Sequence, residues 1–172
     1  MTRRVPHSAP SLGEAEIQAA ERVLRSGRLA QGPEVAAFEE ECAAVAGRTH
    51  AVAVSSGTAA LQLALAALET GDGLRVAIPS YACASLLTAI HALGGEPIVC
   101  DVNEQYTLDA DAVPEEANAA IPVHLFGACC AIPSRVAVVE DVAQAFGGDT
   151  GRQGHVAITS FYATKLLTTG EG

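Results

Sequence analysis

The sequence predicts a three-layer α/β fold built on a mostly parallel sheet. Short apolar runs alternate with helical segments along the chain, as expected for strands that are buried between layers of helices. Polar residues gather where these strands end, and ligands of such folds bind at the carboxyl ends of the strands. At 172 residues, of which 49% are hydrophobic, the chain is long enough to bury a sizeable core.

Two helices are expected before the sheet begins. Ser11 and Glu14 form a capping-box pattern, with Ser11 as the N-cap, that opens a helix running to about Ser26. After a loop, Pro33 suits the first turn of a second helix, and Gly47 suits its end. We therefore expect a helical N-terminal segment ahead of the main domain.

The strands and helices of the sheet alternate from residue 50 onward. Each expected strand is a short apolar run bounded by Gly, Pro or polar residues. The expected strands are residues 50–54, 75–79, 97–101, 120–125, 136–140 and 156–160. The expected helices are residues 58–68 and 83–93, with a weaker piece at 109–116. The first of these helices is nearly all apolar, so we expect it to lie between two layers.

Composition argues against several classes of function. The net charge is −10, whereas a nucleic-acid surface needs a basic stripe. No apolar run approaches the length of a membrane span, and no apolar segment follows the basic N-terminus. The cysteines are odd in number and scattered, and the Cys129–Cys130 pair lacks the spacing of zinc ligands. We expect a cytoplasmic protein that binds no nucleic acid, membrane or metal.

Two residues at strand ends suggest a chemistry. Lys165 is the only lysine of the chain and follows the last expected strand. A cationic amine beside a buried strand is costly and tends to lose its proton, and a neutral amine can form a Schiff base with a carbonyl group. Asp141 ends another expected strand, where its carboxylate can pair with the pyridinium nitrogen of a cofactor. Glu140 should point to the opposite face of that strand.

A turn of small residues, Ser55 to Thr58, leads from a strand into a helix. This layout can hold a phosphate group at the N-terminus of the helix. Simple capping of the helix by Ser56 or Thr58 is an alternative that is compatible with it, and a dinucleotide site is not supported because no GxGxxG motif is present. With the amine and the acid, this turn describes a site for pyridoxal 5′-phosphate (PLP).

Six short sequence motifs occur in an order that is typical of one family. They are QGPEV at 31–35, SSGTAAL at 55–61, PSY at 79–81, PVHLFG at 122–127, EDVAQA at 140–145 and SFYATK at 160–165. Each motif alone is weak evidence for a family, but together they resemble the N-terminal part of the DegT/DnrJ/EryC1/StrS sugar aminotransferases. These are PLP enzymes with the fold of aspartate aminotransferase, fold type I. The resemblance implies that residues 28–172 are part of a PLP-binding large domain, after a segment 1–27.

The resemblance implies roles for individual residues. Lys165 would hold PLP as a Schiff base and, once the amino donor has displaced it, would carry a proton between the substrate carbon and the cofactor. Asp141 would pair with the ring nitrogen, and Gln144 would lie near the phenolic oxygen. The residues expected to hold the phosphate are Gly57, Thr58 and Ser160. The plainer alternatives are a surface lysine, a capping or loop acid, and a polar loop residue.

The residue that covers the cofactor ring stays open. The family usually places an aromatic side chain where this chain has Cys83. Either the Cys83 sulfur packs on the ring or Tyr81 moves into that place. For His124, which follows a strand, a hydrogen-bonded core position and a role in the site are equally open.

The resemblance further implies transfer of an amino group, with glutamate as the expected donor, to a keto sugar linked to a nucleotide. Family members with dehydratase chemistry carry histidine in place of Lys165, so lysine favours transamination over sugar dehydration. Cell-surface polysaccharide and glycosylated metabolites are both possible destinations of the sugar.

The chain also departs from the family. No crossover helix fits between Gly127 and Val136, and the C-terminal small domain of the family is expected to be absent. The alternatives are therefore a homodimer, if the chain is complete, and a non-catalytic fragment or half of a split enzyme that needs a partner chain with the missing part.

Overall fold

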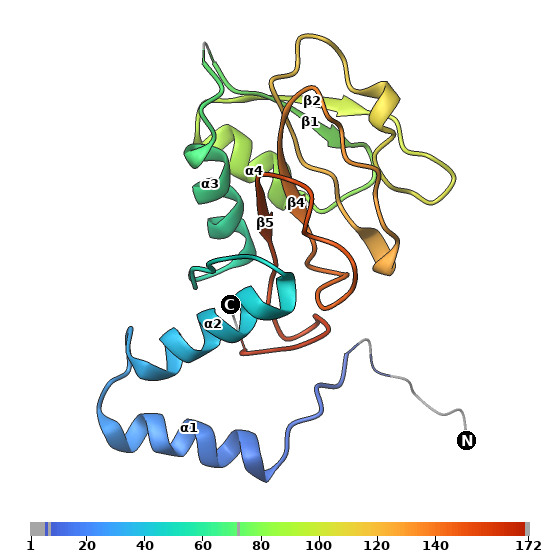
Figure 1. The fold of residues 1–172 in the computed structure, drawn as a ribbon. Helices are drawn as coiled ribbons and strands as arrows, with labels where there is room; N and C mark the ends of the chain where they lie inside the picture. Colours follow the sequence, from blue (N-terminus) through green and yellow to red (C-terminus); the bar gives the residue numbers. More distant parts are fainter. Residues whose placement is uncertain (1–5, 7, 72, 171–172) are drawn as a thin grey trace, which may run out of the picture. The chain divides into compact units, whose positions relative to one another are not determined.

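The computed structural model describes residue 6, residues 8–71 and residues 73–170 (Figure 1). The chain divides into two units, Met1–Ala53 and Val54–Gly172, which we describe separately. The domain boundary expected at residue 28 stays a prediction. None of the helices in the described part of the chain has the length and apolar character of a membrane span.

Five parallel strands form the sheet of the second unit, in the order β2-β1-β3-β4-β5. Their bounds are Arg75–Pro79 (β1), Glu96–Cys100 (β2), Ala119–Ala120 (β3), Ala137–Asp141 (β4) and Val156–Ile158 (β5). The parallel α/β class predicted from the sequence is confirmed. Because all the strands run the same way, their carboxyl ends meet at one edge of the sheet.

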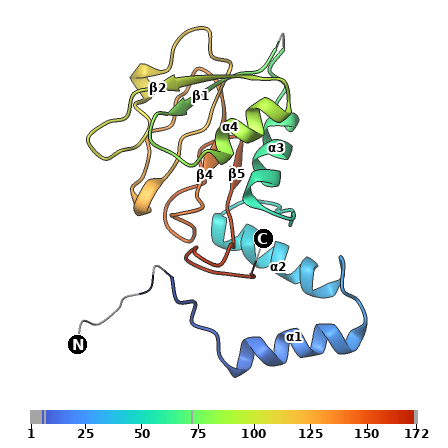
Figure 2. The same cartoon turned by 180° about the vertical axis from the view of Figure 1, so that it is seen from behind.

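Two helices, α3 (Gly57–Ala67) and α4 (Ser85–Ala92), cover one face of this sheet (Figure 1; Figure 2). Side chains alternate along each strand, so Val76 and Ile78 of β1 pack with the buried side chains of both helices. The expectation that α3 lies between two layers is wrong for its outer face, because Leu63 is 58% exposed. The expected helix 83–93 is shorter than predicted and leaves Cys83 in the loop before it.

Irregular segments cover the opposite face of the sheet. The core on this side combines strand residues with residues of the long connections: Ala77, Cys100, Leu108, Val113, Ala117, Ala120 and Cys130. The helix expected at 109–116 is reduced to one 3₁₀ turn, Ala110–Ala112, where the Asp109 carboxylate accepts the N–H of Asp111 at 3.1 Å. Between β3 and β4, where every residue is described, helical structure is limited to the short 3₁₀ turn Leu125–Gly127, as the lack of room for a crossover helix predicted.

Pro122 explains why β3 is shorter than the predicted strand 120–125. Proline has no N–H group to donate to a ladder, so regular pairing stops after Ala120. Pairing resumes at Val123, which forms an isolated parallel bridge with Asp141. The chain therefore stays beside β4 up to the end of that strand, which matters for the site described below.

The first unit contains α1 (Glu14–Ser26) and α2 (Pro33–Ala46). The prediction that Ser11 caps α1 is wrong by two residues, because Gly13 is the N-cap and its N–H donates to the Glu16 carboxylate at 2.6 Å. The second helix was predicted correctly: Pro33 opens it, and Gly47 follows it with a left-handed φ of 65°.

The strand predicted at residues 50–54 does not form within the described residues. A strand needs a neighbour that accepts and donates its backbone hydrogen bonds. Here the N–H of Ala53 donates instead to the Glu39 carboxylate of α2, at 2.8 Å. The composition of this segment favours a strand, but its backbone has a different partner.

Replacing Gly154 with alanine is expected to destabilise the second unit by about 1–3 kcal/mol. An added Cβ would lie 2.9 Å from Val138 Cγ1 and 3.1 Å from the carbonyl oxygen of Val138, which belongs to β4 and cannot move freely. Gly148→Ala is the matched control, since its Cβ would meet only the Ala145 oxygen at 3.4 Å. Urea unfolding of the two variants measures the difference, and equal stabilities would contradict the expected overlap.

Candidate functional site

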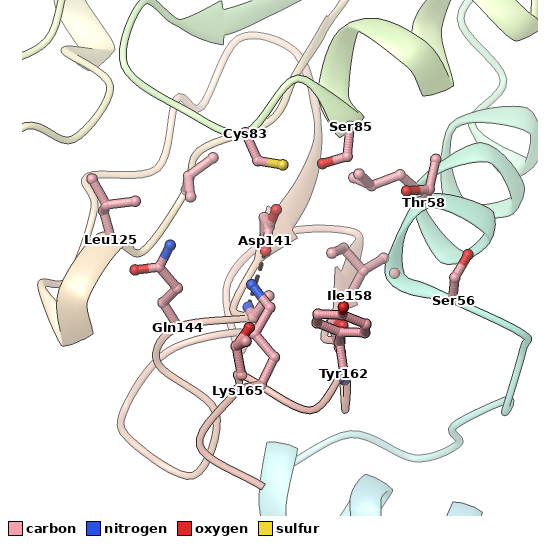
Figure 3. Close-up of a pocket in the computed structure, with 16 residues that line it drawn as sticks. Ser56, Thr58, Cys83, Ser85, Leu125, Asp141, Gln144, Ile158, Tyr162 and Lys165 are labelled. Atoms are coloured by element: carbon pink, nitrogen blue, oxygen red, sulfur yellow. Dashed lines mark hydrogen bonds between the residues drawn. The ribbon is translucent and has the colours of Figure 1, made fainter. Parts of the chain in front are cut away.

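A cavity of about 300 Å³ lies at the carboxyl edge of the sheet (Figure 3). It is formed by the start of α3, the loop between β1 and α4, and the segments at and after the ends of β3, β4 and β5. All seven residues predicted for the site line it: Gly57, Thr58, Cys83, Asp141, Gln144, Ser160 and Lys165. Its size is at the lower end of the range typical of small-molecule sites.

The N-terminus of α3 forms one end of this cavity. Ser56 is the N-cap, and its hydroxyl oxygen accepts the N–H of Ala59 at 3.1 Å. A Cβ on Gly57 would lie 3.1 Å from Ser160 Cβ, so glycine allows the helix to approach the end of β5 closely. Ser56 therefore caps the helix, which is compatible with the phosphate position expected beside Gly57, Thr58 and Ser160.

Asp141 ends β4 and is only 7% exposed. One of its carboxylate oxygens accepts the N–H of Ala143 at 3.0 Å, so the plain role of a turn-forming acid is also fulfilled. Burial raises the pKa of the Asp141 carboxyl, and the Ala143 N–H and the charge of Lys165 oppose this rise. A buried carboxylate of this kind gains most from a cation that enters the cavity.

Lys165 is half-buried and lies in the turn that follows β5. Its backbone N–H donates to the carbonyl oxygen of Tyr162 at 2.8 Å, and its side chain lines the same cavity as Asp141 (Figure 3). The two side chains interact electrostatically. The structure therefore brings together the amine and the acid that the sequence analysis singled out, on one side of the sheet.

Cys83 and not Tyr81 lines the cavity. The ring of Tyr81 packs against Tyr106, with 5.5 Å between the ring centroids, and the side chain is 52% exposed. Hydrogen bonds from the Ser85 side chain and backbone lower the pKa of the Cys83 thiol, and the charge of Lys165 adds to this effect. Of the two residues considered for the ring position, only Cys83 therefore lies at the cavity.

Gln144 lies in the turn after β4 with its amide group at the cavity (Figure 3). Its Oε1 atom accepts the backbone N–H of Phe126 at 3.2 Å. Because a backbone N–H needs an acceptor, this bond identifies the amide oxygen of Gln144. The NH₂ group of Gln144 is then available to a ligand in the cavity. Gln144 is thus oriented to donate a hydrogen bond to an acceptor in the site.

Sequence reasoning missed several residues of the lining. Ser85 opens α4 two positions after Cys83, and Tyr162 belongs to the SFYATK motif, so the spacing and the motif could have indicated them.

His124, for which two roles were open, is fully buried and its ring contacts Glu140 at 3.0 Å. It is therefore a core histidine that does not line the cavity. Within the described ranges, no three His, Cys, Asp or Glu side chains are grouped so that they could hold a metal ion.

Known proteins resemble the chain over almost its whole length. The model of the DegT/DnrJ/EryC1/StrS aminotransferase family matches residues 10–172. The spore coat polysaccharide biosynthesis protein SpsC of Bacillus subtilis is 40% identical, in an alignment that covers 98% of this chain and 48% of SpsC.

Solved structures agree with this match. The PLP form of the putative sugar aminotransferase Spr1654 from Streptococcus pneumoniae superimposes with a TM-score of 0.89 at 28% identity, covering 99% of this chain and 52% of that one. The E. coli GDP-4-keto-6-deoxy-D-mannose-3-dehydratase with bound hydrated PLP shares the fold, with a TM-score of 0.87 at 21% identity over 98% of this chain and 49% of that one. This chain spans about half the length of these relatives. With a family model that matches nearly every residue, the chain belongs to the DegT/DnrJ/EryC1/StrS aminotransferase family.

Proposed function

We propose that this chain is the PLP-binding part of a sugar aminotransferase. The observation that carries the proposal is the meeting of three features in one cavity: the amine of Lys165, the buried carboxylate of Asp141, and the N-terminus of α3. They come from three distant stretches of the chain. Spr1654 has been solved both in a PLP form and in a form with pyridoxamine 5′-phosphate (PMP), and these structures support the choice of cofactor.

The donors and acceptors that line the cavity fit this cofactor. The α3 amides with the hydroxyls of Thr58 and Ser160 suit its phosphate group, and the NH₂ group of Gln144 suits an oxygen on its ring. Because Gly57 has no Cβ, the N-terminus of α3 can lie close to Ser160, which brings the groups that would hold the phosphate together. Bound PLP would supply an electron-accepting ring that stabilises negative charge on the reacting carbon.

The chain's own residues would perform three tasks. Asp141 would hold a proton on the ring nitrogen through its carboxylate. Lys165 would bind the aldehyde carbon through its Nζ atom and, when displaced, carry a proton at that atom. The apolar side chains of Leu61, Val123 and Ile158, which also line the cavity, would exclude water from it.

The family membership supports a proposal for the substrate and the partners. We propose a nucleotide-linked keto sugar as amino acceptor and glutamate as donor, and the relation to SpsC favours polysaccharide biosynthesis. Because the relatives are about twice as long, we propose that amination needs the other half of the family's length, either in the same polypeptide, which would form a homodimer, or in a partner chain. The free state of all five cysteines supports a cytoplasmic location.

Sugar dehydration is the second candidate, because the fold is shared with the E. coli dehydratase as well as with aminotransferases. The amine at position 165 favours transamination instead, since dehydratases of the family carry histidine there. Mass spectrometry of the sugar product separates the two, because amination and loss of water change the sugar's mass differently. A dehydrated sugar without nitrogen would contradict transamination.

Borohydride reduction in the presence of PLP tests the proposal. Lys165 is the only side-chain amine of this protein, so peptide mapping should find the reduced cofactor on the Lys165 peptide. Excess pyridoxine 5′-phosphate, which has no aldehyde, should protect that peptide by occupying the same site. Lys165→Ala is the control, and it should keep only whatever label the N-terminal amine takes. Labelling of wild type that is confined to the N-terminal amine would overturn the proposal.

A further inference from the structure

We propose that Glu140 is a positioning residue of the cofactor site, which acts through His124 and the backbone of Phe126 to orient the amide of Gln144. This inference rests on the proposed function, because it concerns the same site. Glu140 itself does not line the cavity. It precedes Asp141 in β4 and faces the opposite side of the sheet, as the alternation of strand side chains predicts.

Glu140 is 1% exposed and is surrounded by hydrogen-bond donors. One carboxylate oxygen accepts from His124 Nε2 and from the N–H of Gly151, both at 3.0 Å. The other accepts from the N–H groups of Gln153 at 2.7 Å and Gly154 at 2.5 Å. These four partners are donors, so they favour an acceptor-only group at this position, which is an ionised carboxylate.

The ring of His124 has only one arrangement that satisfies both of its contacts. Its Nδ1 accepts the backbone N–H of Cys130 at 3.1 Å, so Nδ1 carries a lone pair and the ring proton lies on Nε2. Nε2–H then donates to Glu140. The carboxylate thereby fixes the tautomer and the orientation of the ring, and the ring in turn holds the loop up to Cys130.

His124 is also tied to the site by its backbone. Its N–H donates to the carbonyl oxygen of Asp141 at 3.0 Å. Two residues later, Phe126 adopts a left-handed φ of 53°, a conformation that is unfavourable for phenylalanine and persists only where its surroundings hold it. In that conformation the N–H of Phe126 donates to Gln144 Oε1. The ring of His124 thus holds the loop on both sides of Phe126, at His124 and at Cys130, and Gln144 holds the N–H of Phe126 itself.

Removal of the Glu140 carboxylate should therefore change the orientation of the Gln144 amide. An amide at position 140 has one oxygen instead of two, so two of the four bonds are lost. The oxygen is expected to keep the shorter bonds from Gln153 and Gly154, so the NH₂ group faces the Nε2–H of His124 and the ring is released. Phe126 can then relax to a more favourable φ and its N–H leaves Gln144. The Gln144 amide becomes free to turn and present its oxygen, instead of its NH₂ group, to an oxygen of the ligand.

Two measurements on the complete protein test this series of contacts from Glu140 to Gln144. In the unliganded protein, Glu140→Gln should shift the side-chain amide NMR signals of Gln144 toward those of a solvated glutamine. Affinity for pyridoxine 5′-phosphate should fall roughly tenfold, the equivalent of one hydrogen bond, while inorganic phosphate, which needs only the N-terminus of α3, should bind as in wild type. Glu96→Gln, an exposed carboxylate in β2, is the matched control and should change neither.

A double-mutant cycle separates positioning from general destabilisation. If Glu140 acts through Gln144, the variant Glu140→Gln with Gln144→Ala should bind pyridoxine 5′-phosphate no more weakly than Gln144→Ala alone. Should Glu140→Gln fail to fold, His124→Gln and His124→Ala provide the same comparison. Glutamine keeps a donor for Glu140 and should retain most of the affinity, and alanine should lose it.

The results distinguish this inference from the proposed function. Absence of any binding of pyridoxine 5′-phosphate to wild type would contradict the proposed function, and the Gln144 signals of the unliganded protein would still decide the positioning role. Unchanged Gln144 signals in Glu140→Gln, or losses of affinity that add fully in the double variant, would overturn the inference.

Discussion

Replacing Asp141 with asparagine is expected to stabilise the unliganded chain while it weakens PLP binding roughly 10- to 100-fold. Burial raises the pKa of Asp141 in the fold above its ordinary value of about 3.9. At neutral pH the ionised side chain therefore reduces the stability of the folded state, and this effect is relieved only as the pH falls through the folded-state pKa. A neutral amide removes the cost, and its oxygen can still accept the N–H of Ala143.

The loss of binding follows from the same substitution. An amide cannot form the charge-assisted bond to a protonated ring nitrogen, and such bonds contribute about 1.5–3 kcal/mol, which corresponds to the stated loss. Thermal unfolding of the unliganded protein and titration with PLP measure the two effects. Asp101→Asn is the control, because Asp101 follows β2 but is exposed and outside the cavity. A lower melting temperature for Asp141→Asn, or unchanged PLP affinity, would contradict the role assigned to Asp141.

Acidification from about pH 5 to pH 2 is expected to remove stability through Glu140, on the order of 3 kcal/mol. Burial by itself would raise the pKa of Glu140, but the hydrogen bonds from His124, Gly154, Gln153 and Gly151 outweigh it and lower the pKa to about 2. A carboxyl whose folded pKa lies below its unfolded value stabilises the fold above the unfolded pKa. This contribution is lost as the pH falls toward the folded pKa.

Urea unfolding at a series of pH values, followed by the methyl NMR signals of Val138 and Val139 in β4, measures this loss in the second unit. Glu140→Gln should be less stable than wild type at pH 7, and the difference between the two should shrink toward pH 2. Taking the difference cancels the opposite contribution of Asp141, which both proteins share. A difference that does not change between pH 5 and pH 2 would show that Glu140 contributes no pH-dependent stability.

The elements that were predicted well depend on neighbouring residues alone. The strand β1 agrees with the predicted range 75–79, and β4 is displaced by one residue, because a buried strand is a short apolar run between residues that break it. The start of α2 at Pro33 and its end at Gly47 follow from local backbone preferences in the same way.

The elements that were predicted badly depend on partners far along the chain. Residues 50–54 have the composition of a strand, yet Ala53 pairs with a side chain of α2. The outer face of α3 is as apolar as its inner face, so the sequence could not show that Leu63 is exposed. Both errors arise because apolar character indicates what can be buried and does not show what is present to bury it.

The site shows the same division. Short motifs placed Lys165, Asp141 and Gly57 at strand and helix ends, and these residues do line one cavity. No pattern in the sequence indicated that Tyr81 packs on Tyr106 and leaves the cavity to Cys83. Nor did any pattern show that Glu140 holds His124, since those two side chains are 16 residues apart in the chain.

The sequence by itself determined the family, the parallel α/β class and the residue types at the carboxyl edge of the sheet, because these are written in short apolar runs and local motifs. Only the tertiary structure decided that Cys83 and not Tyr81 lines the cavity, which way the Gln144 amide points, and that the buried carboxylate of Glu140 bonds to the ring of His124. These properties depend on distances between atoms of separate segments, and such distances exist only after the chain has folded.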